Sequence, residues 1–155
     1  MTDDADRAYV TALGLLARRE LAEAQLRTRL AKRKFQDDEI DAAMTRLRRE
    51  RALDDRRTAL ACARTQVRIK HRGRARVVRH IEALGINRDI AREAVADVFA
   101  ELDENALLEQ ALDRRLRHGL LSDPAVFRRV HRYLLGQGFD PGRVTELLRR
   151  RAKSL

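Results

Sequence analysis

The chain has 155 residues, of which 34 are Lys or Arg and 24 are Asp or Glu, so its formal net charge is +10. This length allows one domain or a short repeat array with a buried apolar core. One cysteine excludes a disulfide framework, and no apolar run approaches the length of a membrane-spanning helix. With no secretory signal at the start, the expected compartment is the cytoplasm, and the charge indicates an anionic partner.

A composition rich in Ala, Leu, Arg and Glu, with two Pro and seven Gly, favours helices. Apolar residues recur at helical spacing in nine segments, and no stretch alternates as a half-buried strand would. The chain is therefore predicted to be all-α, with helices around Tyr9–Leu16, Leu26–Phe35, Ile40–Leu47, Leu60–Val67, Val77–Leu84, Ala91–Leu102, Leu108–Leu116, Phe127–Leu134 and Val144–Leu148.

The helical pattern repeats three times. Five apolar positions, separated by 4, 5, 5 and 4 residues, recur after 51 and then 53 residues. Three-helix units of this size cannot bury an apolar face alone, so they are expected to stack into an elongated body, either straight or curved. We place the repeats at residues 1–53, 54–103 and 104–155. The aligned sets are Leu26, Leu30, Phe35, Ile40 and Met44; Val77, Ile81, Ile86, Ala91 and Val95; and Val130, Leu134, Phe139, Val144 and Leu148.

The turns between the second and third helices also agree. Gly85 and Gly138 stand where a helix end often needs a left-handed residue, whereas the first repeat has Lys34 there. Asn87 and Asp140 follow as expected N-caps of the third helices.

No pattern in the sequence indicates an enzyme. The chain has no Gly-rich phosphate loop and no marked pair of catalytic carboxylates. Cys62 lies among alanines and is best interpreted as a small core residue. We expect no catalytic residues, no cofactor and no metal site, since none of the four histidines has the spacing of a ligand set; these are His71, His80, His118 and His131.

The positive charge is concentrated in one segment. Nine of the 34 basic residues lie within Arg56–Ile81, which has no acidic residue, so 25 basic and 24 acidic residues remain elsewhere. A second cluster in the first repeat is diluted by Glu20 and Glu23. The candidate partner-binding residues are Arg64, Arg68, Lys70, Arg72, Arg74, Arg76 and Arg79, together with Arg18, Arg19, Arg27 and Lys32.

Two other interpretations of this charge stay open. It can be a solvated arginine-rich face, although the long absence of acidic residues argues against that. A helix–turn–helix that reads the DNA major groove is disfavoured, because the third helix of the first repeat begins with Asp37, Asp38 and Glu39, which would repel phosphate.

Several motifs carry a resemblance to a known family. ALGLLARRELAEAQLRTRL at Ala12–Leu30, LDD at Leu53–Asp55, the Gly73–Val77 segment and GFDPGRV at Gly138–Val144 resemble the RecX family of bacterial regulators. The resemblance covers about residues 8–150. It implies a small all-helical protein that binds the RecA recombinase, lies in the groove of its filament on single-stranded DNA, and suppresses ATP hydrolysis, strand exchange and coprotease activity.

The sequence departs from the family at three positions. Ala22 replaces a usual Ser, which predicts the loss of an N-cap worth about 1 kcal/mol. Thr58 and Cys62 replace common aromatics, which predicts weaker packing between the first two repeats.

Two functional hypotheses follow. The first is a regulator that binds RecA and its nucleoprotein filament, acts as a monomer and involves no membrane. The second is a general single- or double-stranded DNA-binding protein that acts by competing for DNA, and it differs in binding DNA tightly without the recombinase.

Overall fold

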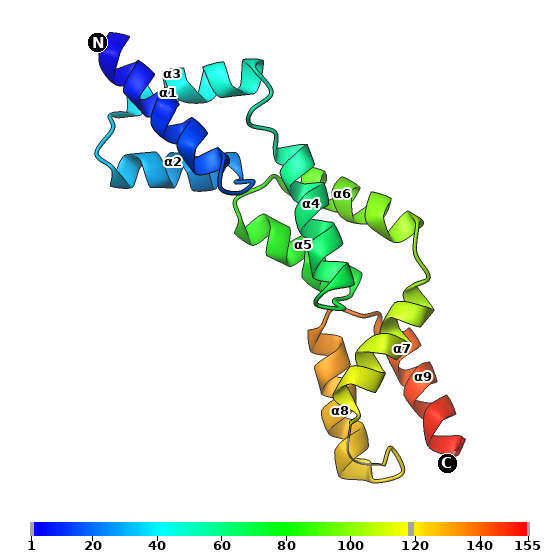
Figure 1. Cartoon of the computed structure of the whole chain (residues 1–155). Helices are drawn as coiled ribbons and strands as arrows, with labels where there is room; N and C mark the ends of the chain where they lie inside the picture. Colours follow the sequence, from blue (N-terminus) through cyan, green and yellow to red (C-terminus); the bar gives the residue numbers. More distant parts are fainter. Residues whose placement is uncertain (1, 118–119, 155) are drawn as a thin grey trace.

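The computed structural model describes residues 2–117 and 120–154, and this part of the chain contains nine helices and no strand (Figure 1). The all-α prediction is therefore confirmed. In chain order the helices are α1 (Thr2–Leu16), α2 (Glu23–Lys32), α3 (Asp37–Arg49), α4 (Asp55–Arg68), α5 (Arg74–Ala83), α6 (Arg88–Ala100), α7 (Glu104–Arg115), α8 (Pro124–Gly136) and α9 (Pro141–Lys153).

The helices pack in three groups that follow one another along an elongated body. We call α1–α3 unit 1, α4–α6 unit 2 and α7–α9 unit 3; within each, the helices contact one another. The N-terminus lies at one end of the body and the C-terminus at the other (Figure 1). The prediction of three tandem three-helix repeats is confirmed, whereas the boundaries at residues 53/54 and 103/104 stay a prediction.

The apolar core is divided into two clusters. One belongs to unit 1 and includes Leu26, Leu30 and Met44. The other runs without interruption through units 2 and 3, and it also takes in Ala22 from the start of unit 1's second helix. Every apolar residue of the aligned repeat positions is buried except Phe35, which is partly exposed. Units 2 and 3 thus share a core, and unit 1 joins them through a small contact.

The turn before each third helix takes the left-handed conformation predicted from the sequence. The φ angles are 69° at Lys34, 85° at Gly85 and 90° at Gly138. A side chain in this conformation costs about 1–2 kcal/mol, a penalty that glycine avoids. Lys34 carries that strain on an exposed turn.

The two glycine turns do more than end a helix, because each touches the preceding unit. A Cβ atom added to Gly85 would lie 2.5 Å from the Cβ of Ala24 in unit 1. A Cβ on Gly138 would overlap the backbone of Arg76 in unit 2. We call each of these contacts a turn–helix junction. The repeat period pairs Ala24 with Ala75, the residue before Arg76, so the two glycines meet the preceding unit at positions one residue apart.

The junction between units 2 and 3 is also bonded through the backbone. The Gly73 amide donates to the Gln137 carbonyl at 2.8 Å, and the Ala75 amide donates to the Gly138 carbonyl at 3.2 Å. A Cβ on Gly73 would lie 2.5 Å from the Gly138 carbonyl carbon, so two glycines allow the two chain segments to meet.

Ala22 has a different role from the one that the sequence suggested. It occupies the repeat position of Gly73 and is fully buried, so a small side chain suits the junction. The missing cap of α2 is supplied from unit 2, because a carboxylate oxygen of Asp55 accepts the Glu23 amide at 2.8 Å. Gln25 also accepts the Ala22 amide at 3.0 Å. Ala22 makes no side-chain cap bond, as predicted, and Asp55 of the neighbouring helix satisfies one of the amides that this leaves free.

The other two family departures lie on different surfaces of α4. Thr58 is buried where units 1 and 2 meet, and its hydroxyl oxygen lies 3.2 Å from a carboxylate oxygen of Glu20. Arg57 donates to the same Glu20 side chain at 2.8 Å. Cys62 is half-buried against the core of units 2 and 3. Thr58 therefore contributes a polar link to the first junction.

Replacing Gly138 with Ala should lower the free energy of unfolding by more than about 2 kcal/mol, because the added methyl meets backbone as well as a positive φ. Lys34→Gly, which relieves the same φ on an exposed turn, should raise it by about 0.5 kcal/mol. Urea unfolding followed by circular dichroism measures both. Equal losses for Gly138→Ala and Gly136→Ala, where an added Cβ meets nothing within 4 Å, would contradict the junction's role.

Candidate functional site

The structure distributes the predicted basic segment over three surfaces. Arg64 and Arg68 lie one turn apart on α4 and line a groove beside α6 and α7. Arg72 and Arg76 lie beside unit 3, at the second junction. The remaining members, Arg74 and Arg79 on α5, line a second groove, and Lys70 is exposed in the α4–α5 loop. The segment does not form one continuous patch.

Three of these arginines are used to hold the fold together. Arg72 donates to the buried Gln66 side chain at 2.5 Å, and Arg76 donates to the Gly136 carbonyl at 3.1 Å. Arg74 forms an ion pair with Glu104, and its guanidinium lies 5.0 Å from the centre of the Phe99 ring. Arg72 lies before α5, which begins at Arg74, so it does not belong to the same helix as Arg76 and Arg79.

Four predicted residues keep their charges free. Arg64, Arg68, Lys70 and Arg79 are exposed, and none forms an ion pair within residues 2–117 and 120–154. These side chains can therefore meet an external anion without breaking an internal bond. Arginine suits that role because its planar fork can bind a carboxylate or phosphate through two hydrogen bonds.

The second predicted cluster is also only partly available. Arg18 and Arg19 are exposed in the connection between α1 and α2, and Lys32 is exposed at the end of α2. Arg27, in contrast, pairs with Asp41 of α3 at 2.6 Å. Unit 1 therefore offers free positive charge at both ends of α2.

The second groove has a volume of about 890 Å³ and brings the predicted Arg74 and Arg79 together with residues that sequence reasoning missed. It lies between α5, α6 and the start of α9, and its basic members are Arg74, Arg79, Arg88, Arg92 and Arg143. Internal partners neutralise part of this charge: Glu82 pairs with Arg88 at 3.1 Å, and Glu104 lies 3.6 Å from Arg143. Arg79 and Arg92 keep free charges in this groove within the described part of the chain.

A further basic row lies on α8. Arg128, Arg129 and Arg132 are all exposed and have no ion-pair partner among the described residues. The sequence carried a signal for them, because residues 124–139 contain no Asp or Glu. Arg92 had no such signal, since it lies between Asp89 and Glu93 and only the fold brings it to the groove.

The second junction is an electropositive microenvironment. Burial, followed by the positive charges of Arg72 and Arg76, lowers the pKa of His80 below its usual value. Burial and the nearby Arg76 lower the pKa of Arg72. Burial raises the pKa of the Cys62 thiol despite the charge of Arg72. Cys62 therefore stays protonated near neutral pH, which agrees with the interpretation of this residue as unreactive.

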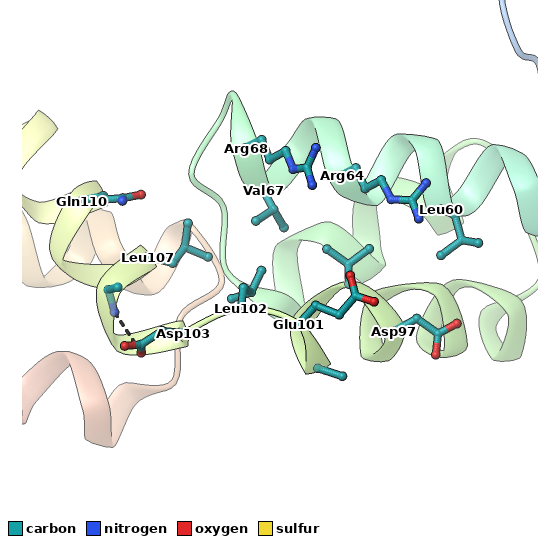
Figure 2. A pocket seen from close by; sticks show the side chains of 13 residues that line it. Leu60, Arg64, Val67, Arg68, Asp97, Glu101, Leu102, Asp103, Leu107 and Gln110 are labelled. Carbon is teal, nitrogen blue, oxygen red and sulfur yellow. Dashed lines mark hydrogen bonds between the residues drawn. The ribbon is translucent and has the colours of Figure 1, made fainter.

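The first groove has a volume of about 720 Å³ and differs from the second in its charge pattern (Figure 2). Arg64 and Arg68 on α4 form one wall, and Asp97 and Glu101 at the end of α6 form the facing wall (Figure 2). Apolar side chains lie between the walls, including Leu60, Val67, Val98, Leu102 and Leu107. The groove is therefore positive on one side, negative on the other and apolar at the bottom.

Comparisons with known proteins agree with this fold. The model of the first three-helix domain of RecX matches residues 8–47, which lie in unit 1. A regulatory protein RecX of Thermus thermophilus is 38% identical over 144 residues, which cover 92% of this chain and 90% of that protein. Its counterpart in Syntrophotalea carbinolica is 32% identical over 134 residues, covering 85% and 88%. The chain belongs to the RecX family.

Solved RecX structures show the same architecture. A crystal structure of regulatory protein RecX superposes with a TM-score of 0.81 at 20% identity, covering 96% of this chain and 73% of that one. RecX from Lactobacillus salivarius superposes with a TM-score of 0.80 at 19% identity over the full length of both chains. The predicted family resemblance and the repeat fold of this RecX chain are thus confirmed.

The described part of this RecX-family chain contains no group of three or more His, Cys, Asp or Glu side chains that could hold a metal ion. His118 lies outside the described residues. None of the described helices is long and apolar enough to cross a bilayer.

The lowered pKa of His80 predicts a pH dependence of stability. Because the unfolded chain binds this proton more readily, the free energy of unfolding should fall as pH decreases from about 7.5 to 5.5 through the unfolded value near 6.5. His80→Gln should reduce this fall, and His131→Gln provides a control histidine in unit 3. Urea unfolding across that pH range measures the effect, and an unchanged profile in His80→Gln would show that other groups dominate.

Proposed function

We propose that this chain binds the RecA recombinase and its filament on single-stranded DNA, and thereby lowers ATP hydrolysis, strand exchange and coprotease activity. The observation that carries the proposal is membership of the RecX family over nearly the whole chain. The relatives are named regulatory proteins, which agrees with a protein that acts by binding rather than by catalysis. Its place of action would be the cytoplasm, and it would work as a monomer without a cofactor.

The shape and the free charges support binding along an extended partner. Basic side chains without an ion-pair partner among the described residues lie on more than one unit of the elongated body, as at Arg18 of unit 1 and Arg79 of unit 2. When the binding surface is already ordered, several contacts along a filament increase the overall affinity, because each contact after the first is intramolecular. Binding changes RecA turnover only if the chain prefers one state of the filament over another.

Among the predicted residues, the free ones are proposed as the binding set. Arg64, Arg68, Lys70 and Arg79 would face carboxylates of the recombinase or phosphates of the DNA, with Arg18, Arg19 and Lys32 contributing from unit 1. Arg72, Arg74, Arg76 and Arg27 would act indirectly, because their internal bonds position helices and junctions.

The alternative is a general DNA-binding protein that competes for single- or double-stranded DNA. The net charge of +10 and the unpaired row on α8 favour it. Such a protein would bind DNA alone, and its affinity would fall with salt by about one power per neutralised phosphate.

Titration of the chain into RecA on single-stranded DNA separates the two functions. We expect ATP hydrolysis to fall at well below one chain per RecA subunit, because each chain acts on an assembled filament. Inhibition that begins only when the DNA is saturated by the chain would favour competition for DNA instead. A matched titration with DNA alone gives the amount needed for saturation.

Charge reversal tests the proposed binding set. The triple variant Arg64→Glu, Arg68→Glu and Arg79→Glu should lose inhibition by at least about tenfold in midpoint while keeping its helical circular dichroism, because none of these residues has an internal partner in the described chain.

The control is Arg128→Glu, Arg132→Glu and Arg149→Glu, which changes the net charge equally on exposed positions of unit 3. It should inhibit nearly as well as the unchanged chain. If both triple variants weaken equally, only net charge matters and the named residues are not the binding set.

A further inference from the structure

The groove between α4 and α6 in unit 2 has charged walls without ion-pair partners in residues 2–117 and 120–154. Arg64 and Arg68 face Asp97 and Glu101 across the apolar floor, and none of the four forms an ion pair within the part of the chain that the structure describes (Figure 2). Their separation across a groove of about 720 Å³ leaves room for a segment of another molecule.

The same place in unit 1 is built differently. The repeat period of 51 residues aligns Tyr9 with Leu60, Arg46 with Asp97, and Glu50 with Glu101. In unit 1 the Tyr9 hydroxyl donates to a Glu50 carboxylate oxygen at 2.5 Å. The Arg46 guanidinium lies 3.6 Å from the centre of the Tyr9 ring, and its Nε donates to Glu50 at 3.0 Å. An aromatic ring and a cation thus bridge α1 and α3.

Unit 3 also links its first and third helices through charge. Arg151 of α9 pairs with Asp113 of α7 at 2.5 Å, and Arg150 pairs with Glu109 at 2.8 Å. Unit 2 has one such link, from Arg56 to Glu93 at 3.1 Å, but it lies at the far end of α4 from the groove. The lining beside Leu60 and Val67 contains no aromatic ring, and its two cations, Arg64 and Arg68, form no ion pair with Glu101 in the described chain.

We propose that this groove binds a segment of the partner protein. The segment supplies the aromatic ring and the cation that unit 1 provides from its own helices. The segment carries an aromatic ring, best a tyrosine, that packs on Leu60 and Val98 and donates to Glu101. A neighbouring Arg or Lys pairs with Asp97, and an acidic residue on its other flank faces Arg64 and Arg68. The inference rests on the proposed function, because the segment is taken to belong to the recombinase.

The charge pattern selects a protein segment over nucleic acid. A phosphate backbone along the groove would gain from Arg64 and Arg68, but it would be repelled by Asp97 and Glu101 on the facing wall. A peptide can place opposite charges on its two flanks and an apolar side chain between them. Such complementarity gives specificity by penalising partners of uniform charge.

The first test fills the groove with the side chains that bridge α1 and α3 in unit 1. The variant Leu60→Tyr with Asp97→Arg installs in unit 2 the residues that bridge unit 1, with Glu101 already present to match Glu50. Binding to RecA filaments on single-stranded DNA should weaken at least about tenfold, measured by co-sedimentation. Binding to single-stranded DNA alone should stay the same or tighten, since the variant raises the net charge by two.

The matched control is Glu146→Arg, which adds the same charge at an exposed position of α9 that has no ion-pair partner in the described chain. It should leave filament binding within about twofold. A second variant, Asp97→Asn with Glu101→Gln, keeps the shapes of two exposed side chains, so it should fold like the unchanged chain. It too should bind filaments several-fold more weakly, because the partner's cation loses the Asp97 carboxylate and its tyrosine loses the charged acceptor Glu101.

The outcomes separate this inference from the proposed function. If the unchanged chain binds filaments and both groove variants bind them equally well, the groove is not the docking site and the proposed function stands. Failure of the unchanged chain to bind RecA, with or without DNA, overturns the proposed function itself. Weakened binding by the groove variants, with DNA binding retained, establishes the groove as a protein-docking site.

Discussion

The close approach of a turn glycine to the unit before it determines how the three units stack. At Gly138 the requirement is double, since the backbone has a positive φ and a Cβ would overlap the backbone of Arg76. Gly85 meets Ala24 in the same way one unit earlier. The contact at its turn glycine therefore orients each unit on the unit before it. Only small residues allow the backbones to approach this closely.

The two junctions lie at corresponding places in the repeat but use different bonds. Between units 2 and 3, backbone hydrogen bonds from Gly73 and Ala75 join a continuous apolar core. Arg114 adds a link by donating to the Ile69 carbonyl at 3.0 Å. Between units 1 and 2 the bonds come from side chains, with Asp55 capping α2 across the junction. Burial raises the pKa of Asp55 and outweighs the opposite effect of the Glu23 amide, so this charged cap carries a desolvation cost.

Much of the fold could be predicted because the apolar residues have the same spacing in each repeat. Apolar residues at equal offsets identified the second and third helices of each unit, and Gly85 and Gly138 identified the turns. The missing side-chain cap at Ala22 could be predicted, but the bond from the Glu23 amide to Asp55 could not, because Asp55 lies on another helix. Local reasoning assigns a cap to the residue before a helix and cannot identify one that tertiary packing supplies.

The candidate site was less accessible to sequence reasoning. The absence of acidic residues correctly marked a basic segment, but it could not separate Arg79, which is free, from Arg74, which pairs with Glu104 thirty residues away. The groove in unit 2 depends on which side chains face each other across two helices. Alignment of the repeats shows that Leu60 stands where unit 1 has Tyr9. That this difference removes a bridge between two helices is visible only from the Tyr9–Glu50 hydrogen bond in the fold.

Because the core is divided between units 1 and 2 and continuous between units 2 and 3, the body bends more easily at the first junction than at the second. Bending between units 2 and 3 must expose a shared apolar core, whereas bending between units 1 and 2 strains a cap, a few polar links and the contacts of Ala22. We therefore expect bending mainly between units 1 and 2, with units 2 and 3 moving together. On a helical partner whose pitch changes, unit 1 can then reorient while units 2 and 3 keep their contacts.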